Sequence, residues 1–189
     1  MSFNAWDVDH PSGTGWIRTA SGRYVNLLAP NPDHINITDI AVSLSQICRF
    51  GGHLPSMYSV AEHSLHIAAL LRRQFGNGYW TLCGLLHDAT EAYMGDMVRP
   101  LKQAMPAYQA AEERMADAVG VAFGLPADWW KNPIVKQADE AALVWEMATV
   151  RDCEWRTPNS PAVVAAHFEA AVRALLPVEV RAFQNEVQP

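Results

Sequence analysis

The chain has 189 residues and a mass of 20.9 kDa, a size that fits one globular domain. Hydrophobic residues make up 50% of it and charged residues 18%, so the composition excludes an intrinsically disordered chain. The formal net charge of -6 argues against a protein that wraps nucleic acid, because phosphate backbones attract basic surfaces. An anionic small molecule would need basic residues that converge locally.

The cysteines and the apolar segments indicate the cellular compartment in which the protein is expected. Cys48, Cys83 and Cys153 are far apart and odd in number, which disfavours a disulfide framework or a cysteine zinc site. The first residues lack the basic and apolar regions of a secretory signal. No window approaches the roughly 20 apolar residues of a membrane span. We therefore expect a soluble, cytoplasmic protein without membrane contact.

The N-terminal part of the chain carries weak strand signals and then a helix. Two short β-prone runs flank the turn at Ser21, which predicts a small hairpin within an N-terminal arm of residues 1–30. Residues 37–47 carry apolar side chains at helical spacing, and Asn36 or Thr38 is the expected N-cap.

The middle of the chain carries clear helix signals. A capping box from Ser59 to Glu62 begins a helix that glycines end near residue 76. Apolar residues predict a further helix over residues 79–92. An amphipathic pattern predicts a long helix over residues 107–123.

The C-terminal part is helical as well. Pro133 is a good first-turn residue and opens a helix to about residue 151, and two more helices are expected over residues 161–175 and 178–186. Six or seven helices with almost no sheet predict an all-α bundle. The expected parts of this single domain (residues 1–189) are the arm (1–30), a core (about 36–150) and the C-terminal helices (158–187).

Four side chains from different expected helices form a candidate metal site: His63, His87, Asp88 and Asp139. Only the core of a bundle can bring them together. Two imidazoles and two carboxylates suit Mn, Fe, Co, Ni or Zn better than Ca, and Mg is a further candidate. The absence of cysteine ligands argues against a closed structural zinc site. Such an ion can lower the pKa of a bound water from 15.7 to about 7 and can polarise a phosphoryl oxygen.

Taken singly, each of these residues also has an ordinary structural interpretation. A buried histidine is often a core residue with satisfied hydrogen bonds, and Asp139 lies in a helical stretch where it could face solvent. The residues around them strengthen the functional interpretation.

Several short segments occur in a characteristic order: YSVAEHS at 58–64, LLHDATEAY at 85–93, GD at 95–96 and PLK at 100–102, with Asp139 downstream. This order resembles the HD superfamily of metal-dependent phosphohydrolases. More narrowly, it is similar to the bacterial 5′-deoxynucleotidases and the phage dATP triphosphohydrolases. The resemblance covers roughly residues 36–150 and implies an HD-domain helical bundle.

The resemblance also implies roles for individual residues. The implied metal ligands are His63, His87, Asp88 and Asp139. Glu91 is implied to act on the attacking water or the leaving group, and Asp96 to contribute to the same step. A carboxylate beside such a water can accept its proton. The ordinary alternatives are an exposed helix-end acid for Glu91 and a loop or N-cap residue for Asp96.

Three further residues are candidates for substrate binding. Arg49 and Phe50 stand where the family's nucleotidases carry an Arg-Trp pair, so the aromatic residue differs. Arg49 could bind a phosphate or sugar oxygen, and Phe50 could stack on a base or pack in the core. Lys102 is expected to face the phosphate as a point charge.

The leading hypothesis is metal-dependent hydrolysis of a deoxynucleotide at the α-phosphorus. It would release phosphate from a monophosphate or triphosphate from a dNTP such as dATP, and the altered aromatic at Phe50 leaves both open. A non-catalytic nucleotide sensor is the first alternative, although a sensor has no need of Glu91. A purely structural bundle is the second, and it predicts no bound metal. By analogy with the family we expect a homo-oligomer with no nucleic-acid partner.

Overall fold

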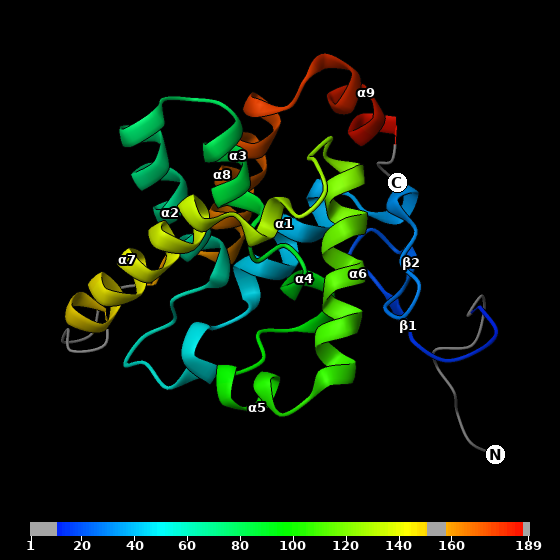
Figure 1. Ribbon diagram of the computed structural model, residues 1–189, viewed down its shortest axis with the longest axis horizontal. Coiled ribbons are helices and arrows are strands. Elements are labelled where there is room, and N and C mark those ends of the chain that lie inside the picture. Colours follow the sequence, from blue (N-terminus) through cyan, green and yellow to red (C-terminus); the bar gives the residue numbers. More distant parts are fainter. Residues whose placement is uncertain (1–10, 151–157, 187–189) are drawn as a thin grey trace.

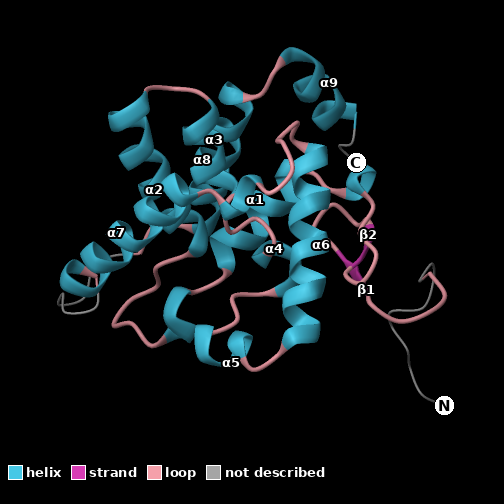
Figure 2. Ribbon diagram, in the orientation of Figure 1, coloured by secondary structure: helices cyan, strands magenta, loops and turns pink. Residues whose placement is uncertain are grey.

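The computed structural model describes residues 11–150 and 158–186 of the chain. It is a bundle of helices with a short antiparallel hairpin at one side, which confirms the expected all-α class with a small N-terminal hairpin (Figures 1 and 2). The first ten residues of the expected arm, the end of the helix near residue 151, Cys153 and residue 187 lie outside the described residues.

The strands are β1 (Trp16–Arg18) and β2 (Tyr24–Asn26). The helices are α1 (Ile37–Gln46), α2 (Val60–Phe75), α3 (Tyr79–Leu86), α4 (Glu91–Met94), α5 (Arg99–Gln103), α6 (Pro106–Ala122), α7 (Pro133–Thr149), α8 (Pro161–Leu175) and α9 (Val178–Glu186). Short 3₁₀ turns, η1 (Pro32–His34), η2 (Arg49–Gly52) and η3 (Trp129–Lys131), connect some of them.

The hairpin is fixed to the start of α1 by one buried carboxylate. Asp39 accepts hydrogen bonds from the backbone N–H of Ser21 at 2.6 Å and from its hydroxyl at 2.8 Å. Asn36 caps α1 by accepting from the Asp39 N–H at 2.9 Å, which confirms the first of the two expected caps. The turn at Ser21 is therefore held against the bundle rather than left free.

Helices α2 and α3 form a closely packed pair that positions three candidate ligands, since His63 lies in α2 and His87 and Asp88 follow directly after α3. The Ser59 hydroxyl and the Glu62 carboxylate complete the expected capping box at the start of α2. Gly84 lies where α3 crosses α2, and a Cβ there would come within 2.6 Å of Leu71 Cδ1. The lack of a side chain at Gly84 allows this close approach.

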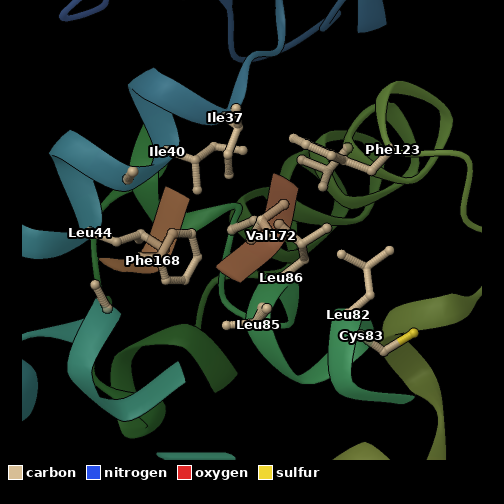
Figure 3. Close-up of a cluster of buried hydrophobic side chains, with 14 of the residues drawn as sticks. Ile37, Ile40, Leu44, Leu82, Cys83, Leu85, Leu86, Phe123, Phe168 and Val172 are labelled. Carbon is tan, nitrogen blue, oxygen red and sulfur yellow. The ribbon is translucent and has the colours of Figure 1, made fainter. Parts of the chain in front are cut away.

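The hydrophobic core lies among α1, α2, α3, α6 and α8. Figure 3 shows Ile40 and Leu44 of α1 beside Phe168 of α8, with Leu85 and Leu86 of α3 beneath. At the other end, the fully buried Gln184 of α9 accepts from the Ile37 N–H at 2.9 Å, and its amide donates to the Ala122 carbonyl at 3.2 Å. The side chain of Gln184 thus ties α9 to both α1 and α6.

One expected helix, residues 79–92, is interrupted. The α-helical pattern ends at Leu86 and resumes at Glu91, with a turn between them. In this turn the Ala89 and Glu91 N–H groups donate to carbonyls three residues back. The His87 ring is hydrogen-bonded through Nδ1 to the Gly84 carbonyl. Because this turn is wound more tightly than an α-helix, the side chains of His87 and Asp88 point in other directions than they would on a continuous α-helix.

Within the described residues, no helix combines the length and the hydropathy that crossing a bilayer requires.

Candidate metal centre

Three of the expected ligands meet in the interior of the bundle. His63 lies in the first turns of α2, and His87 and Asp88 lie in the turn that follows α3. One ligand atom from each of these residues lies within 4.8 Å of the other two. This spacing suits a shared ion, so the cluster of His63, His87 and Asp88 could hold a metal.

Asp139 approaches the same cluster from α7. Its Oδ1 lies 3.1 Å from His63 Nε2, and Asp88 Oδ2 lies 3.7 Å from the same nitrogen. Asp88 Oδ2 is also 3.0 Å from His87 Nε2. Residues that are distant in the sequence therefore present nitrogen and oxygen atoms to one small region, as the four-residue hypothesis requires.

Both imidazoles have the same orientation towards this region. His63 Nδ1 lies 2.5 Å from Glu146 Oε1, and His87 Nδ1 lies 2.9 Å from the Gly84 carbonyl. These oxygens accept hydrogen bonds, so each Nδ1 carries a proton, and in the neutral ring each Nε2 presents a lone pair. Neither Nε2 makes a well-aligned hydrogen bond within the described part of the chain, although both are buried. Two orphaned imidazole nitrogens facing carboxylates are the donor set that a divalent ion would satisfy.

The electrostatics of the cluster favour positive charge. Burial lowers the pKa of His63, but Asp139, Glu146 and Asp88 outweigh it, so this pKa is raised. Burial would raise the pKa of Asp88, but the histidines and Arg49 outweigh it and hold it well below its usual range. The pKa of Asp139 is also lowered despite burial, chiefly by its contact with His63. A cation is therefore stabilised here.

Sequence reasoning missed Glu146, which organises one side of the cluster. This fully buried carboxylate accepts from the Tyr58 hydroxyl at 3.1 Å and from Arg49 Nη2 at 3.1 Å, besides its contact with His63. Its position on α7, two turns after Asp139, was the available signal, since residues seven apart share one helix face.

Arg49 joins the cluster to its surroundings. Its Nη1 lies 3.7 Å from Asp88 Oδ2, and its guanidinium carbon lies 5.3 Å from the centre of the Phe50 ring. Phe50 has a left-handed backbone, with φ at 56°, which is uncommon for a residue with a bulky side chain. Phe50 is half-buried and stacks on Arg49, so it is not a core residue. Its expected contact with a base stays a prediction.

Glu91 is buried and Asp96 is partly buried. Burial and the neighbouring Asp88 and Asp96 carboxylates raise the pKa of Glu91 well above its usual 4.5. Glu91 Oε2 has no hydrogen-bond partner within the described ranges, so it is not the exposed helix-end acid of the ordinary alternative. Burial also raises the pKa of Asp96, whose side chain makes no hydrogen bond or ion pair in residues 11–150 and 158–186.

A cavity of about 400 Å³ opens beside the cluster, a volume within the usual range for small-molecule sites. His87, Asp88 and Asp139 line it together with Lys102. The Lys102 ammonium lies 2.6 Å from the Glu112 carboxylate, so it is held at the cavity wall. The remaining lining residues are Thr90, Glu112, Ala116, Trp130, Lys131, Val135 and Lys136.

A second cavity, of about 420 Å³, lies next to Arg49. Its lining is mainly apolar and includes Leu54, Pro55, Met57 and Tyr58. Arg49 lines this cavity and Asp88 lines the first, so the contact between these two side chains connects the two cavities.

The amino-acid sequence is similar to those of two bacterial proteins. Over 131 residues it is 43% identical to the protein YfdR of Escherichia coli (strain K12), a match that covers 69% of this chain and 70% of YfdR. The chain belongs to the YfdR family. Over 117 residues it is 44% identical to RCAP_rcc00048 of Rhodobacter capsulatus, covering 59% of this chain and 60% of that relative. YfdR and RCAP_rcc00048 are both named as uncharacterized proteins, and no family model matches the chain.

Proposed function

We propose that this chain is an HD-type, metal-dependent phosphohydrolase that acts on deoxynucleotides at the α-phosphorus. The observation that carries the proposal is the convergence of two imidazole Nε2 atoms and two aspartates beside a cavity lined by cations. Without an ion, the partners of these buried nitrogens are aspartate oxygens at 3.0–3.1 Å, and neither contact is a well-aligned hydrogen bond.

The proposed ligands are His63 Nε2, His87 Nε2 and the carboxylates of Asp88 and Asp139. Mixed nitrogen and oxygen ligands suit Mn, Fe, Co, Ni or Zn, with Mg as a further candidate. When bound, the ion would supply Lewis-acid polarisation of a phosphoryl oxygen and a water of lowered pKa. Glu146 and the Gly84 carbonyl would keep the two imidazoles in the ligating tautomer.

Glu91 is the proposed proton carrier. As a carboxylate it accepts a proton from the attacking water, whose oxygen forms a bond to the α-phosphorus. The bond between that phosphorus and O5′ breaks, and Glu91 passes the proton to O5′. One water is consumed, and the products are the deoxynucleoside and either phosphate or triphosphate. The buried setting of Glu91 supports this role, because a raised pKa suits a group that both takes and returns a proton.

Arg49 and Lys102 are the proposed contacts for substrate charge and position. Arg49 lies between Asp88 and the apolar cavity, where it could bind a phosphate or sugar oxygen while the nucleoside occupies that cavity. Phe50, stacked on Arg49, would limit how the arginine can move. We expect a homo-oligomer, by analogy with the HD phosphohydrolases.

The direct test is a screen of deoxynucleoside mono- and triphosphates against the protein loaded with Mn, Co, Mg or Zn. We expect turnover with at least one metal, with deoxynucleoside as a product. After metal stripping and in excess chelator, turnover should disappear and should return when metal is added back. Turnover that is unchanged by stripping would overturn the proposal, and so would failure to hydrolyse any of these nucleotides.

A pair of aspartate variants separates the site from general effects of charge. Asp88→Asn should abolish both metal binding and turnover, because it removes a ligand. Asp33→Asn removes the same charge from an exposed position in η1 and should leave both unchanged. Full activity in Asp88→Asn would contradict the ligand assignment.

A further inference from the structure

We propose that the cavity beside the metal centre binds a chain of phosphates, which makes a nucleoside triphosphate, rather than a monophosphate, the substrate. This inference rests on the proposed function and names the substrate class for that site. The observation behind it is the distribution of lysines. The chain contains three, Lys102, Lys131 and Lys136, and all three line this one cavity.

The three lysines reach the cavity from separate elements. Lys102 comes from α5, Lys131 from η3 and Lys136 from α7. Lysines that serve only solubility would be distributed over the surface and would not cluster around one cavity. A single phosphate group needs few of these cations, whereas a row of phosphates can use all of them, since lysine binds phosphate as a compact point charge.

The charge balance of the cavity also fits a polyanion. Its acidic lining residues are Asp88, Asp139 and Glu112. A divalent ion on the two aspartates would neutralise them, and Glu112 is paired with Lys102. Lys131 contacts Asp128 at 3.0 Å and Glu113 at 3.8 Å, but all three side chains are about half exposed or more, and such surface pairs are weak. A phosphate chain can therefore compete for Lys131.

Two further groups point to an anionic occupant. The side chain of Lys136 makes no ion pair or hydrogen bond with any residue that the structure describes, although it lines the cavity. The indole N–H of Trp130, another lining residue, is buried and has no acceptor among the same residues. Indole nitrogen can only donate, so the partner that it lacks is a hydrogen-bond acceptor.

The first test measures binding without turnover. The metal-loaded protein, in excess Mg²⁺, is titrated with magnesium tripolyphosphate and separately with orthophosphate. Tripolyphosphate should bind more tightly than orthophosphate. Lys136→Gln should weaken tripolyphosphate binding about tenfold, the effect of one lost charge-assisted contact, and leave orthophosphate within about twofold. Equal affinity of Lys136→Gln and the unchanged protein for tripolyphosphate would overturn the inference.

Two variants control this measurement. Lys136→Arg keeps the charge and should restore most of the binding. Arg18→Gln removes one positive charge from the exposed end of β1, away from the cavity, and should leave both affinities unchanged. If Arg18→Gln weakens tripolyphosphate as much as Lys136→Gln does, the effect is one of net charge and the inference fails.

The second test is kinetic and separates this inference from the proposed function. Lys136→Gln should raise the KM for a dNTP about tenfold and leave any turnover of the monophosphate unchanged. Tripolyphosphate should be the released product. Turnover of monophosphates alone, with Lys136→Gln silent, would overturn the inference and retain the phosphohydrolase. Tight tripolyphosphate binding that depends on Lys136, without any hydrolysis, would retain the cavity assignment and overturn the proposed function.

Discussion

His63 Nδ1 and Glu146 Oε1 lie 2.5 Å apart, and both side chains are fully buried. The contact fixes the proton on Nδ1 and turns the Nε2 lone pair towards Asp88 and Asp139. Glu146 thereby sets the orientation of the imidazole without belonging to the proposed set of metal ligands. A carboxylate behind a ligating histidine typically strengthens metal binding in this way.

Replacing Glu146 should weaken metal binding without removing a ligand. Glu146→Gln keeps the shape and an acceptor but loses the charge that pairs with Arg49 and His63. We expect the affinity for Mn²⁺ to fall about 10–100-fold. Competition with a chelating dye measures the affinity, and circular dichroism checks that the fold is retained. Glu140→Gln changes an exposed acid on the same helix and should bind as the unchanged protein does. An unaltered affinity in Glu146→Gln would show that Glu146 does not position His63.

Replacing Asp139 should remove metal and activity together. Its Oδ1 is 3.1 Å from His63 Nε2, within reach of a shared ion. Asp139→Ala is expected to lose bound metal, measured by elemental analysis, and to lose turnover in parallel. The adjacent acid on α7 provides the control, since Glu140→Ala truncates an exposed side chain. Retention of one equivalent of metal by Asp139→Ala would remove Asp139 from the ligand set.

Glu91 should affect catalysis and stability in opposite directions. Glu91→Gln is expected to retain metal but to slow hydrolysis about 10²–10⁴-fold, because it cannot carry a proton. Rapid-quench or coupled assays measure the rate, and elemental analysis measures the metal. Normal turnover by this variant would exclude Glu91 as the proton carrier.

The stability effect of Glu91 depends on pH. Its pKa is raised in the folded chain, so the unfolded chain ionises first as pH rises above about 4.5. Stability is therefore fully present below that pH and is lost as pH climbs towards the folded pKa. Glutamine at this position does not ionise, so Glu91→Gln does not lose stability in this way. In chelator, its Tm relative to the unchanged protein should increase between pH 4 and pH 7. A difference that stays constant across this range would contradict the assignment of a raised pKa.

The capping box should contribute measurably to the stability of α2. Ser59 accepts the Glu62 N–H at 3.2 Å, and Ser59→Ala leaves that donor without its partner. A lost cap costs about 1 kcal/mol, which lowers the Tm by about 2–4 °C in a protein of this size. Ser160 begins α8 without a side-chain cap, so Ser160→Ala should leave the Tm nearly unchanged. Thermal unfolding followed by circular dichroism compares the two variants, and equal shifts would show that the cap at Ser59 is not special.

Much of the fold could be predicted from local signals. The Asn36 cap, the Ser59 box and Pro133 each mark a helix start that the structure confirms, because these signals act within one turn of the backbone. The break after Leu86 was missed. It depends on a hydrogen bond between the His87 ring and the Gly84 carbonyl, and an apolar pattern does not report such a bond.

The candidate site also contains residues that the sequence predicts and residues that only the tertiary structure reveals. The order of His63, His87, Asp88 and Asp139 could be predicted because it resembles a known motif, and their convergence is what the bundle supplies. The contact between Glu146 and Tyr58 could not, since it links segments far apart in the sequence, and only the seven-residue spacing from Asp139 pointed to Glu146. Lys131 and Lys136 were missed because the sequence does not show that η3 and the first turn of α7 line the cavity.

An anomalous-scattering experiment on crystals grown with Mn²⁺ tests directly whether the four side chains share one ion. We expect one strong peak about 2.0–2.3 Å from His63 Nε2, His87 Nε2 and oxygens of Asp88 and Asp139. No peak among these four side chains, or manganese bound only elsewhere, would show that they do not form a metal site.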